Sequence, residues 1–216
     1  MKILEVIPLA LPEIHLIRFA RFRDHRGYFT ENMKASDLVN QAPLEILRGY
    51  QFPQINESFS LAGTVRGLHF QWNPFQGKLV RPIFGHLLDF ILDIRLNSPN
   101  FGKIIGCDMP NSPERDYSEW IWIPPGFAHG ALFPQDSMIE YLCTSEYSPG
   151  CEGCISPLAN DLDWTWCEPA LHSIYQEVCH TSDKLTEKDR NGWTLQQWTT
   201  QSTAQQFTYP MPPTTC

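Results

Sequence analysis

Short runs of alternating apolar and polar residues recur along the chain, and prolines and glycines separate them. Between positions 88 and 94, an apolar side chain occupies every second position. A period of two places these side chains on one face of an extended strand. The segments 120–123 and 139–143 alternate in the same way, and Pro124 ends the first of them. We therefore expect β-strands at these three places.

Helix signals are few. Residues 36–37 are predicted to cap a short helix at 38–41, and residues 182–183 are predicted to cap a second helix that continues to Asp189. Strands at this spacing, without alternating βαβ units, favour an all-β sandwich or barrel. Polar side chains on both faces of the segment 89–95 favour a barrel with a functional interior.

The composition of the chain excludes some classes of function. The 216 residues carry 16 lysines and arginines against 24 aspartates and glutamates, a net charge of −8. This balance argues against a nucleic-acid partner, which usually meets a basic face. No apolar run approaches the ~20 residues of a membrane helix, so we expect no membrane partner. Glu5 and Pro8 interrupt the apolar start where a signal peptide would need a continuous core, and we expect a cytoplasmic protein.

The amino-acid composition changes near Cys179. Glutamine, threonine, serine and tryptophan then dominate, and residues 201–216 carry no charge. We expect a barrel in residues 1–178 and a C-terminal appendage in residues 179–216 that packs on the barrel or is partly mobile.

The densest polar cluster in an apolar setting is Arg66-Gly-Leu-His69-Phe-Gln, followed by Gln-Gly-Lys78. In a regular strand, Arg66 and His69 would point to opposite faces. A histidine exchanges protons near neutral pH and can act as a base, and Lys78 could stabilise an oxyanion. The alternative is a structural histidine bonded to the backbone, and on spacing alone that alternative is the more frequent one.

Cysteine chemistry offers a competing hypothesis. Seven cysteines, an odd number, fit reduced thiols better than a disulfide framework. Cys151 and Cys154 form a two-spaced pair of the kind that zinc sites use. No second such pair follows, so we expect no metal site.

Several strings carry a family resemblance. In chain order they are DHRGYFTE at 24–31, NES at 56–58, RGLHFQ at 66–71, QGKLVR at 76–81, DIR at 93–95, SPNFGK at 98–103, IPPGFAHG at 123–130 and EY at 140–141. From Arg26 to Asp163 the chain resembles the dTDP-4-dehydrorhamnose 3,5-epimerase family, a branch of the cupin barrels. The resemblance implies a double-stranded β-helix (jelly-roll) barrel, a homodimer and a nucleotide-diphospho 4-keto sugar as substrate, with no cofactor and no metal.

The resemblance also implies roles for single residues. His69 matches the general base of the family, Lys78 the group beside the keto oxygen, and Tyr141 the proton donor on the opposite face of the sugar. Six further residues match substrate-binding positions: Arg26, Glu31, Gln54, Asn56, Arg66 and His129. Arg26 and Glu31 match a segment that reaches across the dimer to the nucleotide. The alternative for them is a surface ion pair, worth about 0–1 kcal/mol.

One position departs from the family pattern. Members hold the base histidine against an aspartate late in the barrel, and anchoring on Pro157-Leu158 places that position at Ala159. Asp161 lies two residues further, on the same face of an extended segment. We expect Asp161 to orient His69, because an imidazole without a carboxylate partner is a weaker base.

The resulting prediction is an epimerase that inverts C3, C5 or both carbons of a nucleotide-linked 4-keto-6-deoxy sugar. The alternatives are a cupin that binds the same nucleotide sugar with weak or no catalysis, and a related isomerase that moves the keto group. The sequence leaves the nucleotide, the sugar and the inverted carbon open.

Overall fold

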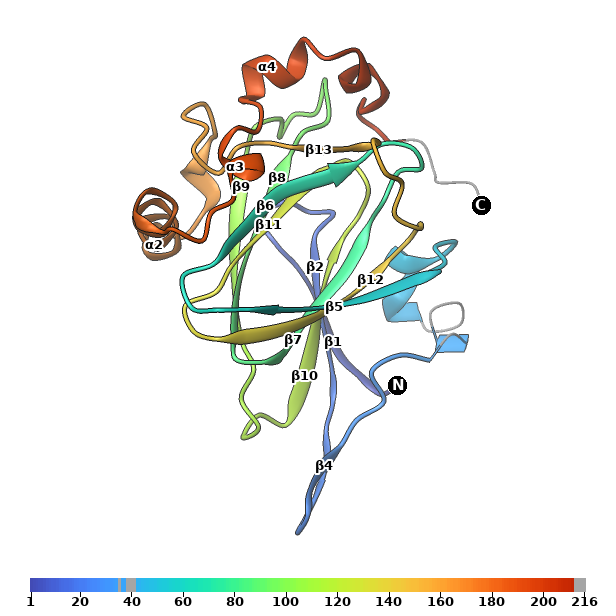
Figure 1. Ribbon diagram of the computed structural model, residues 1–216. Helices are drawn as coiled ribbons and strands as arrows, with labels where there is room; N and C mark the ends of the chain where they lie inside the picture. The colour runs from blue at the N-terminus through green and yellow to red at the C-terminus, as the bar shows by residue number, and fades with distance from the viewer. Residues whose placement is uncertain (35, 38–41, 212–216) are drawn as a thin grey trace.

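Two antiparallel sheets face each other in a barrel (Figure 1). The computed structural model describes residues 1–34, 36–37 and 42–211. In order across the larger sheet, the strands are β1 (Ile3–Pro8), β2 (His15–Ala20), β10 (Tyr117–Ile123), β7 (Lys78–Phe84), β12 (Ser137–Cys143) and β5 (Gln54–Ser60). The smaller sheet contains β13 (Glu152–Cys154), β6 (Val65–Gln71), β11 (Phe127–Leu132), β8 (His86–Asp93) and β9 (Ile104–Pro110). The predicted all-β barrel is confirmed.

The smaller sheet is covered on both faces, as strand β8 shows. Phe90 and Leu92 pack on its outer face in a cluster with the C-terminal helices. Leu87 and Ile91 point the other way, into the barrel interior with residues of both sheets. Because both faces are covered, β8 is buried along almost its whole length, and the alternation predicted for it is confirmed. Strands β10 and β12 likewise contain the other two predicted segments.

The hairpin of β3 (Phe22–Asp24) and β4 (Gly27–Phe29) extends away from the barrel (Figure 1). The 3₁₀ helix η1 (Ala42–Leu47) buries Leu44 and Leu47. The short helix expected at residues 38–41 lies outside the described residues.

The C-terminal third contains η2 (Trp164–Trp166), α2 (Pro169–Thr181), α3 (Glu187–Arg190), α4 (Leu195–Thr199) and η3 (Ser202–Gln206). The helix expected from residue 182 to Asp189 is wrong in its start, because Ser182 is the residue that ends α2. Thr186 caps α3 instead, accepting a hydrogen bond from the Asp189 N–H. Helix α2 was missed, although Leu171, Tyr175 and Cys179 recur every four residues and form its buried face.

The expected boundary at residue 178 falls inside α2. Beyond it, Leu195, Trp198 and Phe207 are buried in the cluster that contains Phe70 of β6. The Trp198 indole N–H donates a hydrogen bond to the Ile94 carbonyl at 2.9 Å. Residues 182–207 therefore pack on the outer face of the smaller sheet through buried aromatic side chains. Over the described residues, no helix combines the length and apolar character needed to cross a membrane.

Candidate active site

A cavity of about 480 Å³ opens between the two sheets and the C-terminal segment. Its lining comes from β5, β6, β7, β11, β12 and the region of α3. The lining residues are Ser58, Thr64, Val65, Arg66, His69, Lys78, His129, Ala131, Ile139, Tyr141, Lys184, Thr186, Lys188 and Asp189. Five of the residues predicted from the sequence are among them: His69, Lys78, Tyr141, Arg66 and His129.

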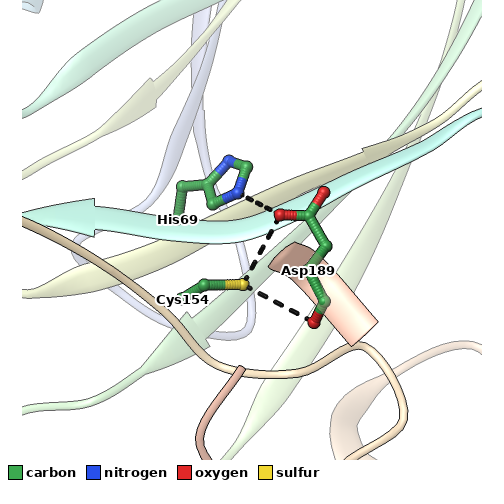
Figure 2. Close-up of side chains that lie close together, drawn as sticks. All are labelled: His69, Cys154 and Asp189. Atoms are coloured by element: carbon green, nitrogen blue, oxygen red, sulfur yellow. Dashed lines mark hydrogen bonds and ion pairs between the residues drawn. The ribbon is translucent and has the colours of Figure 1, made fainter. Parts of the chain in front are cut away.

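His69 and Asp189 form a short polar contact at the cavity. The His69 Nε2 atom lies 2.6 Å from Asp189 Oδ1, and Figure 2 shows the two side chains pointing toward each other. The Asp189 side chain is 6% exposed and that of His69 is 32% exposed, so the pair joins a buried carboxylate to an imidazole that reaches the cavity. With Nε2–H donated to Asp189, the lone pair on Nδ1 is the one available to take a proton.

The Asp189 carboxylate is held in its charged form. Burial by itself would raise the pKa of Asp189, but the hydrogen bond and the charge of His69 outweigh burial and leave the pKa below its ordinary value. The Gly67 N–H adds a longer hydrogen bond to Oδ2 at 3.4 Å. A carboxylate in this state orients the imidazole and stabilises the imidazolium that forms when a proton arrives.

A bulge in β6 brings Arg66 and His69 to the same cavity. In the pairing of β6 with β11, His69 lies opposite His129 and Arg66 lies opposite Ala131. Three steps along β6 therefore match two steps along β11, which is a β-bulge. Regular alternation predicted opposite faces for the two side chains, and that expectation is wrong because the extra residue resets the alternation.

Gly67 is the residue that this bulge requires. Its φ is +109°, a backbone conformation that side chains rarely adopt. A Cβ atom there would lie 2.6 Å from the His129 carbonyl oxygen and 2.7 Å from the Gly130 Cα. The glycine of the Arg-Gly-Leu-His string thus lets β6 and β11 approach closely at the catalytic candidate.

Lys78 and Tyr141 face the cavity from neighbouring strands of the larger sheet. In the register of β7 and β12, Tyr141 pairs with Val80 and Cys143 pairs with Lys78. Burial lowers the pKa of the Lys78 ammonium, and the charge of Asp89 acts in the opposite direction. Burial also raises the pKa of the Tyr141 hydroxyl, so this group keeps its proton at neutral pH.

A second histidine–aspartate pair lies deeper in the barrel. The His129 Nε2 atom is 2.8 Å from Asp89 Oδ1, and the Asp89 side chain is completely buried. The two atoms do not have the alignment of a hydrogen bond, and no described residue donates one to the Asp89 carboxylate. His129 and Asp89 lie on the adjacent strands β11 and β8.

The prediction for Asp161 is wrong. Its carboxylate lies at the start of α4, where Oδ1 accepts a hydrogen bond from the Leu195 N–H at 3.1 Å and Oδ2 accepts one from the Gln196 N–H at 2.9 Å. These are the free N–H groups of a helix N-terminus, which an aspartate satisfies well. Asp161 therefore fixes α4, and the carboxylate beside His69 is Asp189.

Four predicted binding residues are not among those that line the cavity in the described chain, although one of them, Asn56, hydrogen-bonds the Tyr141 side chain. The Arg26 side chain is 79% exposed on the hairpin and pairs with Asp24 at 2.6 Å. Glu31 pairs with the N-terminal amine at 3.2 Å, so the alternative pairing of Arg26 with Glu31 is not what the structure contains. Gln54 and Asn56 lie on β5, where the Gln54 amide donates to the Asn56 Oδ1 at 2.9 Å.

Lys184, Thr186, Lys188 and Asp189 are cavity residues that sequence reasoning missed. One sequence signal could have indicated them. Every charged residue after position 182 lies within residues 183–190, and residues 191–216 carry no charged side chain. Lys188 forms an ion pair with Glu152 of β13, which fastens α3 to the edge of the smaller sheet. The charge concentration thus coincides with the part of the C-terminal segment that enters the cavity wall.

Comparison with known proteins agrees with this architecture. The family model described as dTDP-4-dehydrorhamnose 3,5-epimerase matches residues 8–197. The chain is 36% identical to the dTDP-4-dehydrorhamnose 3,5-epimerase of Sinorhizobium fredii over 185 residues, covering 84% of each protein. It is 37% identical to the Salmonella typhimurium enzyme of that name over 171 residues, covering 76% of this chain and 87% of that protein.

Solved structures show the same fold. A dTDP-6-deoxy-D-glucose-3,5-epimerase from Legionella pneumophila, in complex with dTDP-4-keto-L-rhamnose, superposes with a TM-score of 0.72 at 31% identity, covering 89% of this chain and 93% of that one. A dTDP-4-dehydrorhamnose 3,5-epimerase from Sulfolobus tokodaii gives a TM-score of 0.68 at 34% identity, covering 91% and 97%. The family match, the relatives and the shared fold together place the protein among the isomerases that act on nucleotide sugars. The chain belongs to the dTDP-4-dehydrorhamnose 3,5-epimerase family, and the predicted resemblance is confirmed.

Proposed function

We propose that this chain epimerises a dTDP-linked 4-keto-6-deoxy sugar at C3, C5 or both. The observation that carries the proposal is the set of three groups around one cavity: a carboxylate-supported base at His69, a cation at Lys78 and a hydroxyl at Tyr141. The names of the relatives support the nucleotide and the class of sugar. The Asp189 contact also argues against a non-catalytic homologue, because it supplies the carboxylate that Ala159 lacks at the position expected for it.

The proposed reaction begins with removal of a carbon-bound proton. A C–H bond beside the C4 ketone breaks, its proton moves to His69 Nδ1, and its electron pair delocalises onto the ketone oxygen as an enolate. The Lys78 ammonium stabilises the negative charge on that oxygen. The Tyr141 hydroxyl then delivers its proton to the opposite face of the carbon, the ketone re-forms, and the configuration is inverted. Asp189 stabilises the imidazolium between these two steps.

The diphosphate is proposed to bind at the cationic rim of the cavity. Arg66 lies at this rim with its Nε–H donated to the Ser60 hydroxyl at 2.9 Å, which holds the guanidinium in place. Lys184 and Lys188 approach from the C-terminal segment. A planar guanidinium beside two ammonium groups suits two adjacent phosphates, whose charge it neutralises through several donors.

A homodimer is proposed to complete the nucleotide end of the site. Large apolar side chains are exposed on the projecting hairpin and on β5: Phe22, Phe29, Ile55 and Phe59. Burying such side chains against a second copy would remove apolar area from water. Arg26, Glu31, Gln54 and Asn56 lie on or near these elements, where they could contact a nucleotide bound to the partner. We further propose a cytoplasmic enzyme that needs no metal or cofactor, because Lys78 stabilises the enolate charge.

Isotope exchange tests the proposed reaction directly. The enzyme is incubated with a dTDP-linked 4-keto-6-deoxy hexose in deuterated water, and mass spectrometry counts the deuterium that enters the sugar. Proton NMR then assigns the exchanged carbon and its configuration. Incorporation at C3 or C5 is expected. Tight binding of the sugar nucleotide without any incorporation would contradict catalysis and establish the binding homologue instead.

Tyr141→Phe tests the two-face arrangement. This change removes the hydroxyl and little volume, so His69 can still take the proton while the opposite face loses its donor. We expect inversion to slow by about 10²-fold or more, while deuterium exchange at the carbon that His69 deprotonates persists. Tyr147→Phe serves as the matched control, because Tyr147 is half-exposed and outside the cavity lining. An unchanged rate of product formation in Tyr141→Phe would refute the role.

A further inference from the structure

One member of the cysteine pair noted in the sequence, Cys154, lies beside the His69–Asp189 pair. Cys154 lies in β13 directly opposite His69 in β6. Its sulfur is 3.8 Å from Asp189 Oδ1 and 3.9 Å from the Asp189 carbonyl oxygen. Figure 2 marks both contacts with dashed lines. His69, Cys154 and Asp189 each offer one ligand atom within 4.8 Å of the others, and in the described part of the chain theirs is the one such group of three.

These three atoms form a donor set that suits zinc. One imidazole nitrogen, one thiolate sulfur and one carboxylate oxygen are common ligands of Zn²⁺, at bond lengths of about 2.0–2.3 Å. Ligand atoms of a tetrahedral site lie about 3–4 Å apart at these bond lengths. The distance between His69 Nε2 and Asp189 Oδ1, now 2.6 Å, must therefore lengthen slightly, and the Cys154 sulfur must move toward the other two atoms. His69 and Asp189 both line the cavity, which gives an ion an entry path and a fourth, open position.

The cation would enter from one side of the set. Cys154 is 7% exposed and is not among the residues that line the cavity, whereas His69 is the most open of the three. An ion that reaches His69 and Asp189 through the cavity thus meets the thiol last. The thiol contributes selectivity, because sulfur ligands favour soft ions such as Zn²⁺ or Cd²⁺ over Mg²⁺ or Ca²⁺.

We propose that His69, Cys154 and Asp189 bind a thiophilic divalent cation, Zn²⁺ above all, and that the bound cation inhibits the enzyme. The Cys154 S–H bond breaks, its proton goes to water, and the sulfur keeps the electron pair for the metal. The cation takes the Nε2 position that Asp189 otherwise occupies, so the neutral imidazole carries its proton on Nδ1. With Nδ1 protonated, His69 cannot take a proton from the sugar. The inhibitory half of the proposal rests on the function proposed above, whereas the binding half does not.

Cobalt provides a probe of binding that is independent of activity. The chelator-treated, dialysed full-length enzyme is titrated with Co²⁺, and the thiolate-to-cobalt charge-transfer band in the near ultraviolet is recorded. We expect a band that saturates at one cobalt per chain and disappears when Zn²⁺ displaces the cobalt. In Cys154→Ala this band should be lost, while the matched variant Cys151→Ala, which changes the other cysteine of the pair, should keep it.

Inhibition is measured next, as the rate of deuterium incorporation at a series of buffered free Zn²⁺ concentrations. Zn²⁺ should inhibit the wild type and Cys151→Ala equally, and Cys154→Ala should need at least about tenfold more zinc for the same inhibition. Magnesium at the same free concentrations should have no effect. Circular dichroism and thermal unfolding check that each variant is folded, and Cys154→Ser replaces Cys154→Ala if the alanine variant does not fold.

Three outcomes would overturn the proposal: a charge-transfer band that survives in the Cys154 variant, a band that is lost in Cys151→Ala, or zinc inhibition that is the same with and without the Cys154 thiol. The two proposals fail separately. A metal-free enzyme without isotope exchange would contradict the proposed function and leave the cobalt result standing. An active enzyme without a cobalt band would contradict the metal site alone.

Discussion

The two histidine–aspartate pairs of the molecule use the same side chains in different surroundings. His129 and Asp89 come from neighbouring strands of one sheet, and their contact lies in the barrel interior. His69 and Asp189 come from segments 120 residues apart, and their contact lies where the C-terminal segment meets the barrel. The first pair lacks hydrogen-bond alignment, whereas the second is a short hydrogen bond beside the open cavity.

This difference supports the proposed role of His69 as the proton-transfer group and favours a supporting role for His129. A base must reach its substrate and needs a carboxylate aligned with the opposite ring nitrogen, and only the His69 pair has both properties here. Four experiments test this distinction.

Replacement of the histidines should have the largest effect. We expect His69→Asn to slow deuterium exchange by about 10²–10⁴-fold, because an amide cannot take the proton, while dTDP binding changes by a few-fold at most. His129→Asn should act mainly on substrate binding, raising KM more than it lowers kcat. Exchange kinetics together with calorimetric titration of dTDP provide the measurements. His86→Asn, which alters a histidine of β8 paired with Asp108, is the control. Normal exchange in His69→Asn would show that the base is elsewhere.

Replacement of the two aspartates, Asp189 and Asp161, should have the next largest effect and should distinguish their roles. Asp189→Asn removes the charge that stabilises the imidazolium, so exchange should slow by about 10²-fold or more. Asp161→Asn should leave exchange nearly unchanged and lower the free energy of unfolding by about 1 kcal/mol, because it weakens the cap of α4. Exchange rates and denaturant unfolding of both variants test this pair. The opposite ranking would restore Asp161 as the partner of the base.

A substitution at the β-bulge of β6 should lower the free energy of unfolding more than the other changes proposed here. Gly67→Ala places a Cβ 2.6 Å from a backbone oxygen in a left-handed conformation, and we expect at least about 2 kcal/mol of destabilisation. Gly150→Ala isolates the backbone effect, because Gly150 has a φ of +79° and nothing within 4 Å of the added atom. That control should lose roughly 1 kcal/mol. Equal losses in urea unfolding would mean that the close approach of β6 and β11 is unimportant.

The smallest expected effect is on stability in acid. The pKa of Asp189 is lower in the folded chain than its ordinary value of 3.8, so its ionised form favours folding. This contribution is fully present above the unfolded pKa and is lost as the pH falls through the folded pKa. We expect the unfolding free energy to fall below about pH 4 in the wild type, and Asp189→Asn to show a flatter decline. Parallel curves for the two proteins would contradict the assignment.

Sequence patterns predicted the elements that obey a regular period. Strand β8 was predictable because its apolar side chains alternate, and family strings located His69, Lys78 and Tyr141 in one framework. The bulge was not predictable, since Gly67 signals a special backbone conformation without telling where Arg66 points. Asp189 was not predictable for a different reason: a carboxylate 120 residues from its partner has no local pattern, and Asp161 is the acidic residue in the segment that the family pattern indicates. Helix α2 was predictable from the apolar residues that recur every four positions, but this repeat has no strong capping signal beside it.

The position of Asp189 along the chain has a consequence for biosynthesis. During translation, the last strand of the smaller sheet, β13, leaves the ribosome well before α3, by a matter of seconds at ordinary rates of synthesis. A nascent chain can therefore pair all of its strands while His69 still lacks its carboxylate. The proposed base therefore gains its carboxylate only after α3 has been synthesised. Premature termination anywhere between β13 and α3 would yield a polypeptide with all of the described strands but without the carboxylate of the proposed base.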